Sequence, residues 1–250
     1  MGNYFQPQQC FNNKVVLLLN GLDQIGETLM KLYDEAGAKV YYFNRSEESF
    51  TRYEMFKLSS TQNKKLGMID FQSSNVEEEL RHLMDGEIEK IDVFINNLEH
   101  KVEKDLLDIT PLEWNDGLFV NLHIPFIVLK SYTTFLEASS QAVIIHLTSP
   151  HAIHGGNGEV SYAACKSALE SFNKGLSRAL GAQIRANGVS FDSFQTLRDE
   201  KASSVNGGTV PIKSQATLSD ITNIIMFLSS SLATYINGQV LLVDGGKTYS

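Results

Sequence analysis

Short runs of apolar residues alternate along the chain with longer segments in which apolar residues recur every three or four positions. The short runs predict strands at residues 14–19, 39–43, 66–69, 91–95, 142–147, 184–190 and 238–243. The longer segments predict helices at about residues 24–36, 76–84, 112–138 and 218–228, and one more helix that carries Tyr162. Strands that alternate with helices form parallel sheets covered on both faces. We therefore predict an α/β fold with a doubly wound parallel sheet of about seven strands.

The chain length favours a single domain, because 250 residues can bury one core of ordinary size. We assign residues 1–250 to that domain, with residues 1–12 as an N-terminal extension. Residues from about 192 to 216 are rich in Ser, Asn, Gly and Thr and predict a long mobile loop. Such a loop either covers a site or is simply disordered, and the sequence leaves both alternatives open.

The composition excludes several classes of protein. Apolar residues make up 42% and charged residues 20% of the chain, as in ordinary globular proteins. The net charge of −8 argues against nucleic acid or an anionic membrane as a partner, because both are bound through basic surfaces. No apolar run approaches the roughly 18 residues of a membrane span, and the first residues lack the pattern of a signal peptide. We expect a cytoplasmic protein.

The cysteines and histidines do not predict a metal site. Cys10 and Cys165 are too few for a disulfide or zinc framework. His151 and His154 are expected either to touch a substrate or to be exposed to water, and without carboxylate neighbours they would bind a metal poorly. We therefore predict no metal.

Tyr162 and Lys166 are the strongest candidates for catalysis. Residues four apart share one face of a helix, so the ammonium group is expected beside the phenol. A neighbouring positive charge lowers the pKa of a tyrosine from its ordinary value of about 10, which makes the pair a candidate general acid/base. Ser149 is available to hydrogen-bond a carbonyl oxygen. The alternative is a plain surface pair, which is the commoner reason for this spacing.

The turn after the first predicted strand has features of a dinucleotide site. Gly21 and Gly26 lie between strand and helix, where glycines of Rossmann-type folds let the backbone approach a pyrophosphate. Asp23, between them, places a negative charge near the expected phosphates. Structural turns contain the same residues, so two glycines alone are weak evidence.

Asn44, Arg45 and Ser46 follow the second predicted strand. An acidic residue at this point binds the ribose hydroxyls of NAD, whereas an arginine can pair with the 2′-phosphate of NADP. Arg45 therefore favours NADP(H) over NAD(H), with a solvated loop arginine as the alternative. Asp70, after the third strand, is expected either to bond an adenine amine or to cap a turn.

Asn121 lies in the long helical segment, four residues before Pro125. Proline has no N–H for the carbonyl four residues back, so the backbone oxygen of Asn121 loses its usual helical partner. We expect either a plain kink or a carbonyl that binds a water molecule in a proton relay.

Taken together, these residues resemble the short-chain dehydrogenase/reductase superfamily over nearly the whole chain. The family's glycine-rich turn and its Asn-Asn-Ala-Gly segment correspond to residues 20–26 and 96–99. Its catalytic Asn, Ser and Tyr-x-x-x-Lys correspond to Asn121, Ser149, Tyr162 and Lys166. Residues 184–189 and 235–246 are similar to two further family signatures. The resemblance implies a Rossmann-type fold.

The resemblance also implies a role for each matching residue. Tyr162 would donate or accept a proton, and Lys166 would lower the pKa of Tyr162 and hold the nicotinamide ribose. Ser149 would polarise the carbonyl, and Asn121 would anchor the relay water. Residues after about 192 would form the substrate loop. The residues implied to bind the cofactor are Gly21, Gln24, Ile25, Gly26, Asn44, Arg45, Ser46, Asp70, Asn97, Lys166 and Thr196.

Three departures from the family pattern all concern the cofactor. The glycine turn is one residue shorter and has Gln24 in place of its middle glycine. Leu98 and Glu99 replace Ala-Gly, which adds bulk and a charge near the adenosine ribose. Phe191 and Asp192 replace Pro-Gly next to the nicotinamide. The departures therefore reduce the expected affinity for a dinucleotide and leave the acid/base residues intact.

Two functions follow from these observations. The first is an NADP(H)-preferring oxidoreductase that interconverts a small-molecule carbonyl and a secondary alcohol, with a homotetramer or homodimer implied by the resemblance. The second is a cofactor-poor relative that serves as a binding or scaffold subunit. The intact catalytic positions favour the enzyme.

Overall fold

The central strands are buried along their whole length. β1 (Val15–Leu19), β5 (Val93–Asn96) and β6 (Ala142–Thr148) have no exposed residue, as expected for parallel strands covered on both faces. The structure is a computed structural model that describes residues 10–47, 51–59, 62–192, 194–195 and 210–249. Thr196, residues 1–9 of the predicted extension and much of the predicted loop lie outside this described part.

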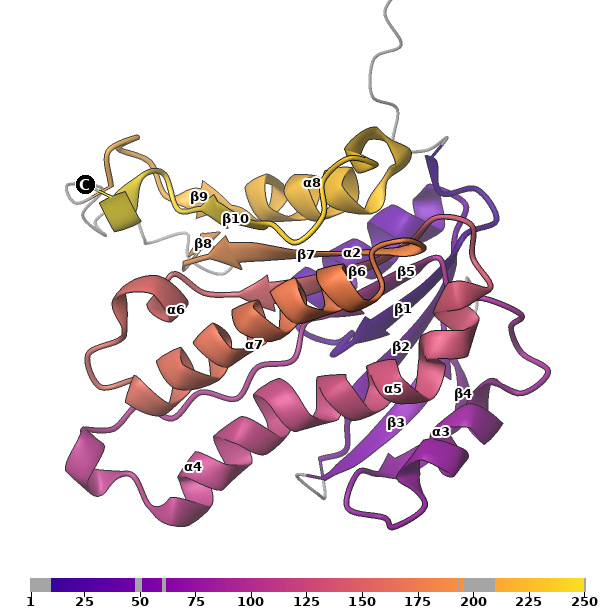
Figure 1. Ribbon diagram of the computed structural model, residues 1–250, viewed down its shortest axis with the longest axis horizontal. Coiled ribbons are helices and arrows are strands. Elements are labelled where there is room, and N and C mark those ends of the chain that lie inside the picture. The colour runs from indigo at the N-terminus through magenta and orange to yellow at the C-terminus, as the bar shows by residue number, and fades with distance from the viewer. Residues whose placement is uncertain (1–9, 48–50, 60–61, 193, 196–209, 250) are drawn as a thin grey trace, which may run out of the picture.

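The strands form an eight-stranded sheet in the order β10-β7-β6-β5-β1-β2-β3-β4 (Figure 1). β1 pairs in parallel with both β2 and β5, so the strand order reverses at β1. In open α/β sheets, ligands bind at the carboxyl ends of the strands beside such a reversal. The other strands are β2 (Lys39–Arg45), β3 (Arg52–Lys57), β4 (Lys64–Asp70), β7 (Ile184–Phe191) and β10 (Val240–Val243), with β8 (Phe194–Gln195) and β9 (Ala216–Thr217) paired separately.

Helices cover both faces of the sheet (Figure 1). α2 (Gln24–Glu35) and α8 (Leu218–Ser229) contribute to the hydrophobic core on one face. α3 (Val76–Met84), α5 (Ile124–Glu137) and α7 (Val160–Ala179) cover the other face. The Rossmann-type fold is therefore confirmed. The shorter helical elements are η1 (Leu106–Asp108), α4 (Pro111–Leu118), η2 (Phe119–His123), α6 (His151–His154), η4 (Ser231–Ala233) and η5 (Lys247–Tyr249).

The sheet has one strand more than predicted and is not wholly parallel. β3 pairs antiparallel with both β2 and β4. Its sequence alternates polar and apolar residues, with Tyr53 and Met55 buried, which is the ordinary signature of a strand. Because β3 lies between β2 and β4, Asp70 at the end of β4 lies one strand further from β1 than a parallel sheet would place it.

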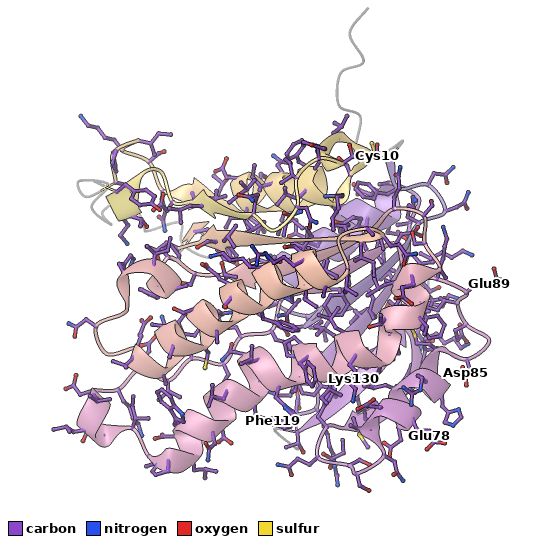
Figure 2. All side chains as sticks on the ribbon, in the orientation of Figure 1. Cys10, Glu78, Asp85, Glu89, Phe119 and Lys130 are labelled. Carbon is purple, nitrogen blue, oxygen red and sulfur yellow. The ribbon has the colours of Figure 1, made fainter. Side chains whose placement is uncertain are left out.

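Acidic side chains lie on the outside of the molecule. Figure 2 shows Glu78, Asp85 and Glu89 on and after α3, and all three are exposed. Within the described residues, no helix is both long enough and apolar enough to cross a membrane.

Candidate active site

A cavity of about 380 Å³ opens at the carboxyl ends of β1, β5, β6 and β7. Ser149, Tyr162 and Lys166 line it together, so the structure brings three of the four predicted catalytic residues into one place. From the predicted cofactor residues it adds Gln24, Ile25 and Asn97. The volume is at the lower end of the roughly 300–1,000 Å³ that is usual for ligand sites.

Tyr162 is buried on the first turn of α7 and donates a hydrogen bond from Oη to Glu99 Oε1 at 2.7 Å. Burial raises the pKa of Tyr162 well above its ordinary value, the negative charge of Glu99 raises it further, and a hydrogen bond with Ser149 opposes both. The net pKa of Tyr162 is thus raised rather than lowered, because burial and the Glu99 carboxylate dominate. The Glu99 side chain therefore lies against Tyr162 at the cavity.

Lys166 is buried one helical turn after Tyr162, and its Nζ lies 5.4 Å from the centre of the tyrosine ring. The ammonium group donates hydrogen bonds to the backbone oxygens of Leu98 and Leu147, each at 3.1 Å. Burial lowers the pKa of Lys166, and the charge of Glu99 partly compensates. Two of its three N–H groups are thus bonded to the ends of β5 and β6, and the third is available to a ligand hydroxyl.

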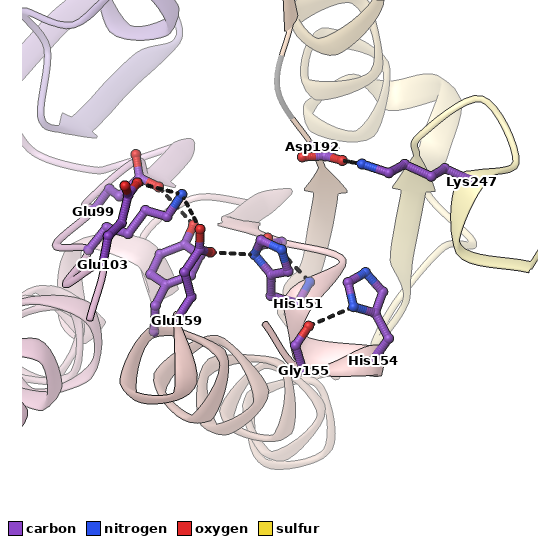
Figure 3. A network of polar contacts seen from close by, with 11 residues as sticks. Glu99, Glu103, His151, His154, Gly155, Glu159, Asp192 and Lys247 are labelled. Atoms are coloured by element: carbon purple, nitrogen blue, oxygen red, sulfur yellow. Dashed lines mark hydrogen bonds and ion pairs between the residues drawn. The ribbon is translucent and has the colours of Figure 1, made fainter. Parts of the chain in front are cut away.

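Ser149 follows β6 and contacts His151, which lies on the short helix α6. Ser149 Oγ accepts from the His151 backbone N–H at 3.3 Å and lies 3.4 Å from the ring Nδ1. The same Nδ1 lies 2.9 Å from Glu159 Oε2, so the expectation that these histidines have no carboxylate neighbour is wrong for His151 (Figure 3). Among the described residues, no group of three or more metal-ligating side chains is gathered.

Asn121 lies at the centre of η2, a π-helical turn that joins α4 to α5 without breaking the helix. Its side chain accepts from the His100 N–H at 3.1 Å and donates to the oxygens of His100 and Gly117 at 2.8 and 2.9 Å. Asn121 therefore fixes the segment that follows β5, one residue beyond Glu99. It is buried beside the cavity and is not part of the cavity lining. Single π-helical turns inside α-helices are frequent at functional sites.

The N-terminus of α2 already has a carboxylate bound to it. Asp23 is the N-cap and accepts from the Gly26 N–H at 2.6 Å. Asn97 Nδ2 lies 2.8 and 2.9 Å from the two carboxylate oxygens of Asp23, and Asn20 Nδ2 lies 2.9 Å from one of them. Burial raises the pKa of Asp23, and these hydrogen bonds oppose the rise. The anion site of this helix is thus filled by the chain itself.

Gly21 and Gly26 are required by close packing. A Cβ at Gly21 would lie 2.6 Å from the ring of Tyr42, and a Cβ at Gly26 would lie 2.5 Å from the backbone oxygen of Asn20. Asn20 has a φ of 66°, a left-handed conformation that asparagine tolerates better than most residues. Gly21 therefore lets the turn pack against β2, and Gly26 lets the start of α2 pack against the turn after β1.

The residues at the end of β2 lie away from the cavity lining. Asn44 donates to the Arg45 backbone oxygen at 3.3 Å, and the Ser46 N–H donates to the Arg52 oxygen at 2.8 Å. Arg45 is close enough to His100 for its charge to lower the pKa of that histidine, although burial is the larger cause. Arg45 is thus on the same edge of the sheet as the site.

Asp70 acts as a turn cap in this structure. Its Oδ1 accepts from the Gln72 N–H at 3.1 Å, and its Oδ2 lies 3.3 Å from Arg52 Nε. Of the two alternatives for Asp70, these contacts support the turn cap, because β3 separates Asp70 from β2.

Sequence reasoning missed Lys101, which lines the cavity, and its ion-pair partner Glu159. Lys101 Nζ lies 2.7 Å from Glu159 Oε1 and 3.1 Å from Glu103 Oε1, and 5.9 Å from the centre of the Tyr162 ring. Figure 3 shows Glu159 between Glu103 and His151. Lys101 and Glu159 come from two loops far apart in sequence, so no local pattern indicates their meeting. Asp192 also lines the cavity and pairs with Lys247.

A family model described as enoyl-(acyl carrier protein) reductase matches residues 22–248. Relatives include the 3-oxoacyl-(acyl-carrier-protein) reductase FabG of Chlamydia muridarum, 27% identical over 94% of this chain and 97% of its own. The FabG of Escherichia coli (strain K12) is also 27% identical, over 94% of this chain and 98% of its own. The chain belongs to the short-chain dehydrogenase/reductase superfamily. Members of this superfamily are oxidoreductases that use NAD(P)(H) to interconvert carbonyls and alcohols, and the chain is an oxidoreductase of this type.

Solved structures share the fold. A short-chain dehydrogenase from Leptospira borgpetersenii with bound NAD+ has a TM-score of 0.79 at 22% identity, covering 99% of this chain and 98% of its own. A gluconate 5-dehydrogenase from Burkholderia cenocepacia, in complex with NADP and tartrate, has a TM-score of 0.77 at 21% identity, covering 98% of each chain.

The residues present fit the reacting end of a nicotinamide dinucleotide better than its pyrophosphate. Tyr162, Ser149 and one free N–H of Lys166 face a common cavity, as a carbonyl and a ribose hydroxyl require. At the start of α2, the Gly26 N–H is already bonded to the Asp23 carboxylate. A bound pyrophosphate would therefore compete with the Asp23 carboxylate for this N–H group.

Replacing Asp23 by Ser tests this competition. Serine keeps the N-cap and removes the charge, so we expect the Kd for NADPH to fall by about tenfold, as removal of one close like charge implies. Fluorescence titration measures it, with Asp85→Ser, on the exposed surface, as the matched control. An unchanged Kd in Asp23→Ser would show that Asp23 does not compete with the phosphates.

His146 in β6 makes stability depend on pH. Burial and, to a smaller extent, the charge of Lys166 lower its pKa to about 3. The folded protein thus keeps His146 neutral, while the unfolded chain takes up a proton near its ordinary pKa of about 6.5, so stability falls as the pH drops below that value.

We expect wild-type protein to lose about 2 kcal/mol of unfolding free energy between pH 7 and pH 5 through this residue. His146→Gln, whose side chain can still accept from Asn96, should lack this loss. Urea unfolding at both pH values measures it, with exposed His82→Gln as the control. An equal loss in wild type and His146→Gln would contradict the prediction.

Proposed function

We propose that the protein is an NADP(H)-preferring carbonyl reductase in which Tyr162 is the general acid. The observation that carries the proposal is the meeting of Ser149, Tyr162 and Lys166 in one cavity at the strand-order reversal. A bound nicotinamide supplies the hydride. The chain's own residues hold the carbonyl and move the proton.

Each residue has a distinct part in this reaction. The Ser149 hydroxyl donates a hydrogen bond to the carbonyl oxygen, and Tyr162 transfers its phenolic proton to that oxygen as negative charge develops there. The buried Lys166 ammonium stabilises the phenolate that forms and binds a ribose hydroxyl with its remaining N–H. Asn121 acts at a distance by fixing the backbone at His100.

The preference for NADP(H) rests on Arg45. The fold accommodates either cofactor in its structural relatives, one of which holds NAD+ and another NADP. In this chain β2 ends with Asn44 and Arg45, so its last two residues are a neutral amide and a guanidinium group rather than a carboxylate. A guanidinium group suits a 2′-phosphate, and a ribose diol is bound by an acidic residue in NAD enzymes.

The first substrate class to examine is the 3-oxoacyl thioester, because relatives over 94% of the chain are 3-oxoacyl-(acyl-carrier-protein) reductases. Phe191 and Phe194 add apolar surface to the cavity, which suits an acyl chain. We also propose that Thr196 contacts the nicotinamide carboxamide and that the substrate loop forms a wall of the pocket. A cytoplasmic location remains a prediction.

An apolar surface on α4, η2, α5 and α7 supports the proposed homodimer or homotetramer. It forms a hollow of about 700 Å³ lined by Leu118, Phe119, Leu122, Phe126 and Phe172. Phe126 exposes 42% of its surface, and apolar patches of this kind on helices commonly face a second subunit. These are the long helices on which the family's oligomers are built, so a second copy of this chain is the proposed partner.

Replacing Tyr162 by Phe removes the proton donor and keeps the ring. We expect NADPH-dependent reduction of a 3-oxoacyl thioester to fall by at least about a hundredfold, the usual contribution of a general acid. Circular dichroism should show a folded protein. The proposal fails if Tyr162→Phe retains wild-type turnover.

Replacing Arg45 by Ala tests the cofactor preference. We expect the Kd for NADPH to rise by about tenfold or more while the Kd for NADH stays nearly constant, because only NADPH has the 2′-phosphate. Paired fluorescence titrations measure both, with exposed Arg178→Ala as a control. Tighter binding of NADH than NADPH by the wild type would contradict the assignment.

A further inference from the structure

The hydroxyl hydrogen of Ser149 has a competing acceptor within reach. In the proposed reaction it has to point at the substrate carbonyl oxygen, and a hydroxyl group has only one hydrogen to donate. Ser149 Oγ lies 3.4 Å from His151 Nδ1, a ring nitrogen that accepts a hydrogen bond in one tautomer and donates one in the other. A tautomer without hydrogen on Nδ1 would therefore compete with the substrate for the hydrogen of Ser149.

The carboxylate of Glu159 decides between the two tautomers of His151. Its Oε2 lies 2.9 Å from Nδ1, and Figure 3 shows the carboxylate directed at the ring. A nitrogen without hydrogen at this distance would set its lone pair against that of the oxygen, so Nδ1 has to carry the hydrogen. Oε2 is buried and has no well-aligned hydrogen bond within the described part of the chain, so the nearby N–H group is what offsets its burial.

Glu159 is held in place from its other side. Lys101 Nζ lies 2.7 Å from Oε1 of Glu159, which leaves Oε2 for His151. Only 16% of the Glu159 side chain is exposed, so its pairing with Lys101 is screened less than an ion pair on the open surface. The carboxylate therefore keeps one oxygen on Lys101 and the other on the ring.

With a hydrogen on Nδ1, Ser149 is an acceptor toward His151 and a donor toward the cavity. Its Oγ accepts from the backbone N–H of His151 at 3.3 Å and faces the ring N–H at 3.4 Å. The hydroxyl hydrogen is thus directed away from His151. Tyr162, which lines the same cavity, is within hydrogen-bond reach of Ser149. A carbonyl oxygen that binds beside Tyr162 can take the hydrogen of Ser149.

We propose that Glu159 is a positioning residue for Ser149: it keeps a hydrogen on His151 Nδ1 and so directs the hydroxyl hydrogen of Ser149 to the substrate carbonyl. This inference rests on the proposed function, in which Ser149 polarises that carbonyl. No proton is transferred along the three residues, because Glu159 only sets which groups donate and which accept. A doubly protonated ring has the same Nδ1–H group, so the role does not depend on the charge of His151.

Nitrogen NMR of the imidazole rings in the full chain measures the tautomer, at mildly alkaline pH, where histidine is ordinarily neutral. We expect the Nδ1–H form of His151 in the wild type and mainly the Nε2–H form in Glu159→Ala. Glu103→Ala is the matched control, because it removes a carboxylate of the same network that contacts Lys101 instead, and it should keep the Nδ1–H form. His154, whose Nδ1 lies 2.6 Å from a backbone oxygen, should keep its Nδ1–H form in all three proteins.

Kinetics test the consequence for Ser149. We expect Glu159→Ala to lower kcat for NADPH-dependent reduction of acetoacetyl-coenzyme A by about tenfold with little change in KM, because a hydrogen-bond donor to the transition state is diverted. In a His151→Phe background the ring has no nitrogen to accept from Ser149, so the same Glu159→Ala substitution should cause no further fall in kcat. Glu103→Ala should match the wild type.

Each result has a distinct meaning. A wild-type His151 in the Nε2–H form, or an Nδ1–H form retained in Glu159→Ala, overturns the role of Glu159. An equal fall of kcat in both backgrounds also overturns it, because a merely structural role of Glu159 would not depend on the His151 nitrogen. These results leave the proposed function standing where the wild type reduces the thioester. Absence of reduction by the wild type overturns the proposed function, and the catalytic role of Glu159 with it.

Discussion

The carboxylate of Asp23 holds together the corner of the fold on which the site is built. It accepts hydrogen bonds from the Gly26 N–H at the start of α2 and from the side chain of Asn97 at the end of β5. Asn20 completes the group, because it bonds to Asp23 and exchanges hydrogen bonds with Asn97 in both directions. The N–H groups at the start of a helix require partners, and here the chain supplies one itself. The relative positions of β1, α2 and β5 are therefore set without a ligand.

This arrangement explains the acidic character of the cavity. Two residues after Asn97 the chain reaches Glu99, so the segment that Asp23 fixes also carries the carboxylate bound to Tyr162. An incoming phosphate competes with Asp23 for a backbone N–H, and an incoming carbonyl competes with Glu99 for the phenolic hydrogen. The competition with Asp23 becomes weaker as that carboxylate takes up a proton, and burial raises the pKa of Asp23.

Much of this could be read from the sequence, because the decisive signals are local. Apolar runs such as residues 15–19 and the spacing of Tyr162 and Lys166 depend only on the period of strand or helix. β3 is not predicted by an apolar run, because charged residues occupy half of its positions (Arg52, Glu54 and Lys57). The contact of Glu99 with Tyr162 depends on how closely the segment after β5 approaches α7. The two residues are 63 positions apart in sequence, so no local pattern predicts their contact. The sign of the Tyr162 pKa shift was wrong for the same reason, since burial is a property of the packed structure.

Burial of ionisable groups gives a physical reason to regard the site as an active one. Lys166 exposes 2% of its surface, and its ammonium group is bonded to two backbone oxygens beside the face of Tyr162. A buried ammonium group usually lowers stability relative to an apolar residue of similar volume, so such groups occur mainly where a function requires them. A binding subunit would need neither this charge nor the adjacent phenol, because an apolar pair would pack the same space at lower free energy. Lys166 beside Tyr162 therefore favours proton transfer as the use of this cavity, and the departures around Asp23 and Glu99 alter the conditions under which it takes place.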